Sequence, residues 1–455
     1  MKNKIVLITG NFNILHSGHL RLFAFAKKFA SKLIVAVNSD KTAGNAAILK
    51  EKLRLETVKN SNLVSKAVIL NEPISKLIKK LKPSYIVKGK EYEFKHNAEA
   101  NVLKKIGGKL IFSSGESILS SRDLIKKEFD IINSKKTELP NEFISRHNIN
   151  KNKLINIVKK FKNLNVLVLG DLILDEYITC QPLGMSQEDS SIVVKPIENE
   201  FFLGGAGIVA SHVAALGANS NFISVTGKDS YLAIIQKKLK MNNVKNSLIL
   251  DLSRQSSCKK RFRTENQVLF RLSELTKASI SNSIQNKIFN EVKKSIKKTD
   301  LVIFSDFNYG VLAQNLVNKI IKLCKINKVM MVADSQSSSQ IGDISRFNGM
   351  DLITPTEHEA RISTKNYDDG LIIMTEKLRK LSSAKNIILK MGNEGLIIHA
   401  KGTIKGDWIN DRIRSLNSSP KDVIGAGDSL LTTSALALKV GASVWEASLL
   451  GSLAA

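Results

Sequence analysis

Two histidines near the N-terminus stand at a spacing that suits phosphate chemistry. His16 and His19 flank Gly18, shortly after an apolar run, residues 4–9, that ends at Gly10. A strand that ends at a glycine before a helix offers free backbone N–H groups and the positive end of the helix dipole. Two imidazoles there can donate hydrogen bonds to oxygens that gain charge when an α-phosphorus is attacked. With seven histidines in the chain, an incidental pair at this spacing is the weaker interpretation.

A second glycine-rich segment lies near the C-terminus. Gly425, Ala426 and Gly427 precede Asp428, and an apolar helical segment, residues 430–438, follows. Small residues let backbone N–H groups close on an anion, and the aspartate can accept a proton from a sugar hydroxyl that attacks ATP. Taken alone, the segment fits an ordinary glycine-rich turn equally well, so it needs support from the rest of the chain.

Short apolar runs separated by helical patterns position both segments. The alternation predicts two α/β domains, each built on a parallel sheet. A polar stretch with a proline, residues 134–141, predicts a linker. We expect a domain at 1–130, a linker and helix at 131–163, and a larger domain at 164–455. The expected strands are 4–9, 33–37, 67–70, 85–87 and 109–112, then 165–170, 221–225, 301–305, 329–334, 352–354, 386–390 and 395–399.

Composition favours a cytoplasmic protein with a sizeable core. Of 455 residues, 43% are hydrophobic, and no apolar run approaches the roughly 20 residues that span a membrane. The first ten residues are typical of a strand and not of a signal peptide. The cysteines, Cys180, Cys258 and Cys324, are scattered, which predicts neither a disulfide framework nor a zinc site.

The net charge of +28 leaves two interpretations open. A basic chain can bind nucleic acid or an anionic membrane, or it can simply handle phosphorylated substrates. The lysines are spread along helical faces, as at Lys76, Lys79, Lys80 and Lys82, without an aromatic-interleaved basic stripe. We therefore expect small phosphorylated substrates, and neither a nucleic-acid nor a membrane partner.

The N-terminal segment resembles the nucleotidyltransferase superfamily of cytidylyltransferases and adenylyltransferases. The His-x-Gly-His signature carries the resemblance, and residues 35–40, 52–54, 83–89, 107–109 and 120–122 support it in the family's order. The resemblance covers residues 4 to about 128 and is greatest to the adenylyltransferase half of the enzymes of ADP-heptose synthesis. It implies a Rossmann-like fold.

The resemblance also implies roles for individual residues. His16 and His19 would stabilise the transition state, Lys88 would neutralise nucleotide phosphates, and Mg²⁺ would bridge phosphates. The sugar phosphate itself would attack, so no protein nucleophile is needed. Asn13, where many members carry Asp, and Ser121-Arg122, where they carry Thr, are mild departures. The nucleotide would contact Gly10, Phe12, Ser120 and Ser121.

From residue 165 to its end the chain resembles the ribokinase-like (PfkB) sugar kinases. Residues 170–175, 203–206, 355–359 and 390–395 match the family's motifs in order, ahead of the glycine-rich segment. The resemblance implies that Asp428 is the catalytic base and that ATP is the phosphoryl donor. It implies Gly425, Ala426, Gly427, Lys390 and Gly392 for the nucleotide, Asp175, Gly204 and Gly205 for the sugar, Lys259, Arg261 and Arg271 for its 7-phosphate, and Glu359 for Mg²⁺ through water.

Several positions depart from the kinase pattern. Ile208 stands where a sugar-contacting Asn is expected, and an apolar side chain cannot replace its hydrogen bonds. Thr356 replaces the Asn of the Asn-x-x-Glu motif, while Tyr309 and Gln336 stand where heptose kinases carry Lys. The order of the two halves is also reversed relative to the usual bifunctional enzyme. The chain stops in an apolar helix, which leads us to expect a shortened C-terminus.

Three functions fit these observations. The leading interpretation is a homodimeric bifunctional enzyme with two activities. It phosphorylates a sugar phosphate, which we expect to be heptose 7-phosphate, at C1. It also transfers a nucleotide to a sugar 1-phosphate, which gives ADP-heptose and pyrophosphate. The second keeps the transferase and makes the kinase half a binding or dimerisation module. The third changes the sugar, or replaces ATP by CTP in the transferase. The identity of the base and of the sugar anomer stay open.

Overall fold

The computed structural model describes residues 4–13, 15, 17–89, 92, 97–113, 139–264, 267–337, 342–402, 407–417 and 423–455. The predicted site residues His16, Ser120 and Ser121 lie outside this set. The chain divides into two compact units: unit 1 comprises residues 1–136 with 365–377, and unit 2 comprises 137–364 with 378–455. Within the described residues, no helix combines the length and apolarity that a membrane crossing requires.

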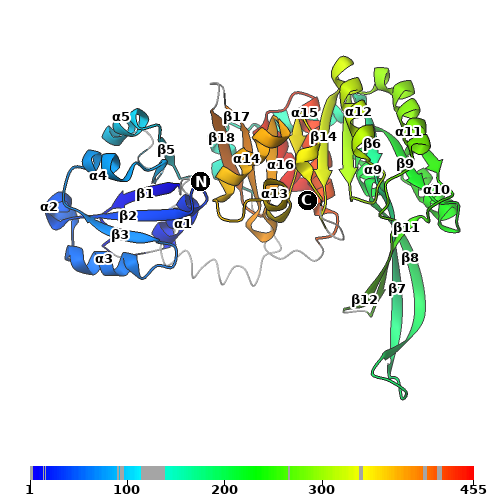
Figure 1. Ribbon diagram of the computed structural model, residues 1–455, viewed down its shortest axis with the longest axis horizontal. Coiled ribbons are helices and arrows are strands. Elements are labelled where there is room, and N and C mark those ends of the chain that lie inside the picture. The colour runs from blue at the N-terminus through cyan, green and yellow to red at the C-terminus, as the bar shows by residue number, and fades with distance from the viewer. Residues whose placement is uncertain are drawn as a thin grey trace. The chain divides into compact units, whose positions relative to one another are not determined.

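Unit 1 is built on a five-stranded parallel sheet with the order β3-β2-β1-β4-β5 (Figure 1). The chain runs outward from β1 through β2 to β3, then crosses back to β4 on the other side of β1. The point where the order reverses lies between β1 and β4, and ligands bind at such points in open α/β sheets. The elements are β1 Ile5–Gly10, α1 Ser17–Lys27, β2 Lys32–Asn38, α2 Asp40–Ala43, η1 Gly44–Ala46, α3 Glu51–Lys59, β3 Lys66–Leu70, α4 Ile74–Leu81, β4 Tyr85–Lys88, α5 Ala98–Lys105 and β5 Lys109–Phe112.

The core of unit 2 is a nine-stranded sheet with the order β10-β9-β6-β13-β14-β15-β16-β17-β18. Its pairs are parallel from β10 to β16, and β17 and β18 close the edge antiparallel. The strands are β6 Asn165–Gly170, β9 Asn219–Thr226, β10 Lys245–Leu250, β13 Leu301–Asp306, β14 Met330–Ser335, β15 Leu352–Ile353, β16 Asn386–Lys390, β17 Leu396–Lys401 and β18 Trp408–Ile413.

Helices connect these strands and cover the sheet. Neighbouring parallel strands must be joined by a crossover connection, and helices supply most of these connections here. The helices are α9 Ala206–Ala215, α10 Tyr231–Met241, α11 Asn282–Ser295, α12 Gln314–Ile326, α13 Glu357–Thr364, α15 Ala426–Lys439 and α16 Val444–Ala454, with short 3₁₀ segments η4 Ile296–Lys298, η5 Ile344–Arg346 and η6 Gly392–Glu394. A further helix, α14 Leu371–Ser382, belongs to unit 1 as far as residue 377 and to unit 2 from residue 378.

A second, four-stranded sheet projects from unit 2 (Figure 1). Its order is β12-β11-β7-β8, and its longest strands, β7 Leu172–Met185 and β8 Ile192–Gly205, form a hairpin of 14 residues each. β11, Ser257–Arg263, and β12, Val268–Glu274, complete it. The distal half of the hairpin is largely exposed, which explains why no continuous apolar run marks these strands in the sequence.

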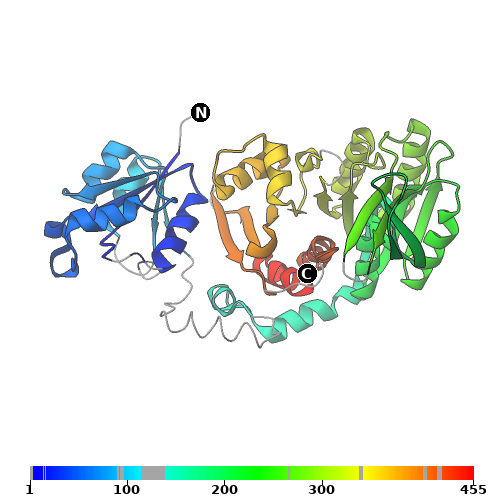
Figure 2. The ribbon, with the colours of Figure 1, turned by 90° about the horizontal axis from the view of Figure 1, so that it is seen from below.

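Two helices ahead of β6 belong to the core of unit 2. α7, Asn141–Arg146, and α8, Lys151–Lys159, are followed by a 3₁₀ turn, η3 Phe161–Asn163. Phe143, Ile157 and Phe161 are buried in the unit's main hydrophobic cluster. Polar contacts also hold the segment: Arg146 forms a bidentate pair with Asp411 of β18 (both 2.9 Å), and Lys153 of α8 pairs with Glu446 of α16 at 2.7 Å. Figure 2 shows this segment, in teal, beside the red C-terminal helices.

The expected fold class is confirmed in both halves. Unit 1 is a Rossmann-like parallel α/β unit, and unit 2 is a larger α/β unit with a mostly parallel sheet. Each apolar run that the sequence predicts as a strand lies in one of the two large sheets. The four-stranded sheet was not predicted.

Truncation of Phe161 should destabilise unit 2 by about 3–5 kcal/mol, because a fully buried ring leaves a cavity in the core. Val158→Ala, in the preceding helix, is the matched control: Val158 is 39% exposed, and the expected change is within about 0.5 kcal/mol. The two tryptophans, Trp408 and Trp445, both lie in unit 2, so fluorescence during urea unfolding reports on that unit. Equal unfolding midpoints for the two variants would show that the segment only lies on the surface.

Candidate functional sites

The predicted N-terminal site lies where the strand order of unit 1 reverses. Gly10 ends β1, Lys88 ends the neighbouring β4, and His19 lies in the first turns of α1. β1 and β4 pair in parallel, so their carboxyl ends lie at the same edge of the sheet. The structure therefore brings Gly10, Lys88 and His19 to one edge.

Phe12 folds back over Gly10 and contacts His19. Its side chain is 4% exposed, and its ring meets the His19 ring edge-on, with centroids 5.1 Å apart. A Cβ at Gly10 would lie 3.0 Å from the Phe12 ring, so a side chain at Gly10 would displace that ring. Phe12 thus positions an imidazole, while its predicted contact with the nucleotide stays a prediction.

The fully buried Arg54 organises the loops around this edge. Its guanidinium donates to the carbonyls of Asn11, Asn38 and Leu49 at 2.7–2.8 Å and pairs with Asp40 at 2.7 Å. It therefore ties together the segments that follow β1 and β2. Sequence reasoning assigned no role to this arginine.

Asn13, a departure from the family pattern, uses both ends of its amide. Its nitrogen donates to the carbonyl of Ala46 at 2.8 Å, and its oxygen accepts from the backbone N–H of Ile48 at 2.8 Å. A carboxylate at this position could accept but not donate. The amide therefore suits this loop better than the family's usual Asp.

Lys88 is held by a glutamate at the start of α5. Its ammonium forms an ion pair with Glu99 of α5, donates to Asn97 at 2.9 Å and lies 5.2 Å from the centroid of the Tyr92 ring. The Lys88 and Glu99 side chains are 14% and 8% exposed. Glu99 is a second residue that sequence reasoning missed, because no motif contains it.

The predicted C-terminal site forms where parallel strands of unit 2 end. Asp428 lies in the first turn of α15, which begins directly after Gly425, and its neighbours are the ends of β14 and β16. Gln336 donates to Asp428 at 3.4 Å. Burial, followed by the charge of Asp334, raises the pKa of Asp428 to about 7, from the usual 3.8. A carboxylate with such a pKa is suited to general base catalysis near neutral pH.

Lys390, at the end of β16, pairs with the buried Asp334. Its ammonium lies 3.1 Å from each carboxylate oxygen of Asp334. A Cβ on Gly427 would lie 3.4 Å from the same ammonium, which places Lys390 beside the glycine-rich segment. Gly392 follows in the 3₁₀ turn η6. Sequence reasoning selected Lys390, the last residue of β16, but not Asp334, the second-last residue of β14.

Glu359 is fixed by backbone N–H groups. Its carboxylate accepts from Thr356 at 2.7 Å and from Ser337 at 3.2 Å, and the Thr356 hydroxyl accepts from the backbone of Glu359 at 3.3 Å. This reciprocal pair is a capping arrangement at the start of α13. Thr356, a departure from the family pattern, therefore has a structural role in this chain.

The residues predicted for the sugar lie on neighbouring strands of the four-stranded sheet. Asp175 of β7 forms an ion pair with Arg261 of β11, and a Cβ on Gly204 would lie 2.1 Å from the Asp175 carboxylate. Gly204 therefore leaves the space that this carboxylate occupies, and Gly205 follows it as the last residue of β8.

The basic residues predicted for a phosphate lie close to this aspartate. Lys259 is the pairing partner of Asp175, and Arg271 of β12 is the partner of Arg261. Directly opposed residues share a face of a sheet, so Asp175, Lys259, Arg261 and Arg271 lie on one face. The structure brings these four predicted residues together.

A buried aspartate, which belongs to the 170–175 motif but was given no role of its own, supports the loop beside these residues. Asp171 accepts from the backbone N–H groups of Phe307, Tyr309 and Val311 at 2.8–3.2 Å. Burial and the charge of Asp306 raise its pKa to about 6. The supported loop carries Tyr309, which is 1% exposed and whose hydroxyl has no hydrogen-bond partner among the described residues. The ammonium of Lys259 lies 5.5 Å from the Tyr309 ring centroid.

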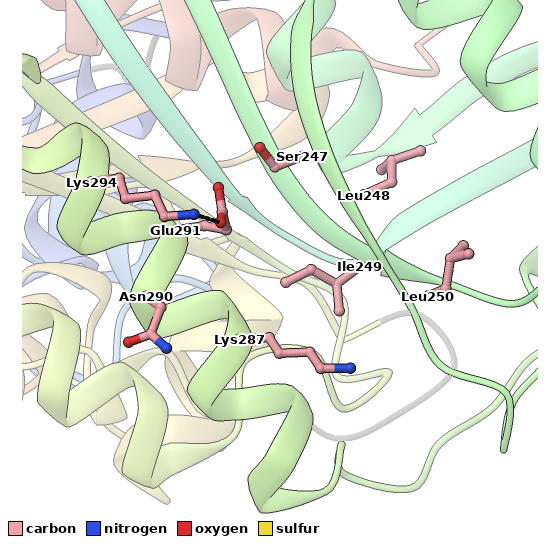
Figure 3. Close-up of a pocket in the computed structure, with 8 residues that line it drawn as sticks. All are labelled: Ser247, Leu248, Ile249, Leu250, Lys287, Asn290, Glu291 and Lys294. Carbon is pink, nitrogen blue, oxygen red and sulfur yellow. Dashed lines mark hydrogen bonds and ion pairs between the residues drawn. The ribbon is translucent and has the colours of Figure 1, made fainter.

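An open pocket of about 840 Å³ lies elsewhere, between the edge strand β10 and α11 (Figure 3). None of the predicted site residues lines it. Its charged side chains include Glu291 and Lys294, which pair with each other at 2.6 Å. This pocket therefore does not coincide with either of the two predicted sites.

Comparisons with known proteins find a family for each half of the chain. Residues 7–152 match the model of the cytidylyltransferase-like family, and residues 164–455 match that of the pfkB family carbohydrate kinases. The chain is 30% identical to the "Bifunctional protein HldE" of Desulfatibacillum aliphaticivorans over 66% of this chain and 60% of that protein. It is 29% identical to the same-named protein of Sulfurimonas denitrificans over 66% of this chain and 61% of that protein.

The chain thus spans about 60% of the length of the curated relatives that it matches. Among solved structures, phosphofructokinase-2 from Escherichia coli superposes with a TM-score of 0.51 at 14% identity, over 62% of this chain and 88% of the other. That likeness supports the fold of unit 2. The pfkB match covers more than half of the sequence, and the chain therefore belongs to the pfkB family of carbohydrate kinases.

Proposed function

We propose that this chain is a bifunctional enzyme of nucleotide-sugar synthesis. Its kinase half would phosphorylate a sugar phosphate, heptose 7-phosphate at C1, with ATP, and its transferase half would convert a sugar 1-phosphate to ADP-heptose with release of pyrophosphate. The observation that carries the kinase proposal is the buried Asp428 at the start of α15, with a pKa of about 7. The two relatives described above, which are 29–30% identical to this chain, are named as bifunctional proteins.

Asp428 would act as the base of the kinase. Its carboxylate accepts the proton of the attacking sugar hydroxyl, while the backbone N–H groups of Gly425, Ala426 and Gly427 face the transferred phosphoryl group at the positive end of α15. Gln336, which donates to Asp428, orients the carboxylate. Asp175 and Gly204 would fix the sugar, and Lys259, Arg261 and Arg271 would attract its phosphate.

Mg²⁺ would enter this site together with ATP. No group of three or more His, Cys, Asp or Glu side chains that could hold a metal ion is found among the described residues. This fits an ion that keeps several waters and binds through substrate phosphates with one or two carboxylates. Each Glu359 oxygen accepts one backbone N–H, which leaves lone pairs for a metal-bound water. When bound, Mg²⁺ neutralises charge on the phosphates.

The transferase half would work by positioning and charge stabilisation. Lys88 would neutralise the nucleotide phosphates. His16 would stabilise the transition state, and Ser120 and Ser121 would bind the nucleotide; these three residues lie outside the described residues. His19, which contacts Phe12, would donate to the α-phosphate as the sugar phosphate attacks. These residues support a nucleoside triphosphate as the substrate of the transferase half, and we propose that it is ATP.

We also propose a cytoplasmic homodimer. The four-stranded sheet exposes large apolar side chains, including Ile192 (57%), Ile197 (66%), Phe270 (50%) and Leu272 (47%), and such a surface favours association. All three cysteines are free and buried, as suits a reducing compartment.

A second function has support from one residue. Tyr309 occupies a position where heptose kinases carry Lys, so it supplies no positive charge there, and its buried hydroxyl has no hydrogen-bond partner among the described residues. The kinase half would then be a binding or dimerisation module. The ion pair of Asp175 with Arg261 and the pKa of Asp428 favour the active kinase.

Purified protein with heptose 7-phosphate and ATP should yield a sugar bisphosphate, and Asp428→Asn should lower the rate by at least about a hundredfold, because the base is lost. Product formation is followed by mass spectrometry, and transferase activity by pyrophosphate release from ATP or CTP with sugar 1-phosphates. A background rate equal in wild type and Asp428→Asn would instead favour the binding module. Reaction of another sugar phosphate alone would retire the heptose assignment.

The kinase rate should fall as the pH drops through about 7. Asp428 must be ionised to accept a proton, and its raised pKa means that ionisation is lost near neutrality, about three units above an ordinary aspartate. The measurement is kcat/KM for the sugar between pH 5.5 and about 8.5 at saturating ATP. A rate that is flat down to pH 5.5 would contradict the role of the buried carboxylate.

Glu99→Gln should lower the KM for the nucleotide in the transferase reaction by about tenfold, because the buried carboxylate competes with phosphate for the Lys88 ammonium. Glu142→Gln, a change of the same kind in unit 2, is the control and should leave this KM unchanged. An unchanged or raised KM in Glu99→Gln would show that Glu99 helps to place Lys88 for the nucleotide.

A further inference from the structure

A fully buried arginine in unit 1 spends its hydrogen bonds on the protein itself. Arg54, in α3, is 0% exposed, and its guanidinium donates to the carbonyls of Asn11 and Asn38 at 2.7 and 2.8 Å. It also donates to the carbonyl of Leu49 at 2.8 Å and pairs with the carboxylate of Asp40 at 2.7 Å. Four of the five N–H donors of the guanidinium are therefore engaged. Arg54 is thus placed to hold backbone segments and not to contact a nucleotide.

The bond to the Asn11 carbonyl constrains the next residue, Phe12. This carbonyl belongs to the planar peptide group that joins the two residues, so its direction is tied to the φ angle of Phe12. Phe12 has a φ of 50°, in the left-handed region that a residue with a bulky side chain rarely adopts. Such a conformation persists only where the surrounding structure enforces it. A hydrogen bond from a fully buried guanidinium supplies that constraint.

The residues on both sides of Phe12 are also held through their side chains. The side chain of Asn11 accepts from the amide of Asn38 at 2.7 Å. The amide of Asn13 bonds two backbone groups of a neighbouring loop, each at 2.8 Å. These contacts hold side chains, whereas Arg54 holds the main chain directly before Phe12.

The backbone conformation of Phe12 determines where its ring lies. Phe12 is 4% exposed, and its ring packs over Gly10, where a Cβ would lie 3.0 Å from it. The ring centroid is 5.1 Å from that of the His19 imidazole and 5.6 Å from that of Phe23. A different φ at Phe12 would turn the ring away from the imidazole. Arg54 therefore acts on His19 through one peptide group and one aromatic ring.

We propose that Arg54 is a positioning residue of the transferase half, which fixes the backbone at Phe12 and so the aromatic ring against the His19 imidazole. The catalytic part of this inference rests on the proposed role of His19 in nucleotidyl transfer, whereas the structural part does not. Arg54→Lys keeps the positive charge but loses the planar fork that reaches several carbonyls at once. Phe12 should then leave the left-handed region, and the imidazole should lose its aromatic neighbour.

The test follows the His19 signal by nuclear magnetic resonance in the full chain, labelled with ¹³C at the ε1 position of histidine. The chain has seven histidines, so the spectrum is simple, and His19→Gln assigns the signal that disappears. Phe12→Leu gives the chemical-shift change that loss of the ring causes. Arg54→Lys should move the His19 signal in the same direction by a comparable amount. Lys59→Met, which removes an exposed charge at the end of the same helix, is the control and should leave the signal in place.

The kinetics of the transferase reaction distinguish positioning from nucleotide binding. Arg54→Lys should lower kcat by about tenfold or more and change the KM for the nucleotide by less than about twofold, because His19 would act on the transition state. A raised nucleotide KM with an unchanged kcat would make Arg54 a nucleotide-binding residue and overturn the proposal. If the wild type itself transfers no nucleotide, the proposed function fails, and the His19 signal still decides the structural part.

A folded Arg54→Lys protein whose His19 signal matches that of the wild type would also overturn the proposal. Dispersed methyl signals establish the folding of unit 1, because both tryptophans lie in unit 2. If Arg54→Lys does not fold, Asp40→Ala decides, since it removes a partner of the guanidinium whose side chain is 37% exposed. A His19 signal that moves toward its position in Phe12→Leu supports the proposal, and an unmoved signal overturns it.

Discussion

The parallel strands of unit 2 all end at one edge of the sheet, and that edge collects charges that must be balanced without water. Asp171, Asp306, Asp334 and Lys390 each lie at or directly beside the end of such a strand. A different partner stabilises each buried carboxylate. Asp171 accepts hydrogen bonds from three backbone N–H groups. Asp306 pairs with Arg346 at 2.8 Å, and Asp334 pairs with Lys390. The loops around the site are held in place by these same contacts.

This balance explains how the site tolerates departures from its family's pattern. Thr356 in place of Asn keeps Glu359 fixed through a reciprocal cap, and Gln336 in place of Lys donates to Asp428. Removal of a cation at position 336 leaves Asp428 with the nearby charge of Asp334, which helps to keep its pKa high. The substitutions therefore change how the proposed base is held and leave its raised pKa in place.

The strands that were predicted from the sequence are those whose residues are buried on both faces of a sheet. Residues 4–9, 301–305 and 386–390 are continuous apolar runs, and each is a central strand of a large sheet. The four-stranded sheet escaped prediction because its faces are partly exposed and its register joins distant segments, as where Lys259 pairs with Asp175. Helices α7 and α8 lie in a segment that polarity alone assigns to a linker and helix, yet Phe143 and Phe161 are core residues.

The motifs did not identify the residues that pair with the predicted site lysines. A motif identifies Lys88 or Lys390, but whether its ammonium is free depends on Glu99 and Asp334, which come from other elements. Both lysines are paired with buried carboxylates, so under the proposed functions a nucleotide phosphate would have to replace Glu99 at Lys88 and Asp334 at Lys390. Such an exchange costs less desolvation than burial of a free lysine would, since the ammonium never loses a counter-charge. The same logic favours phosphates over neutral ligands at both sites.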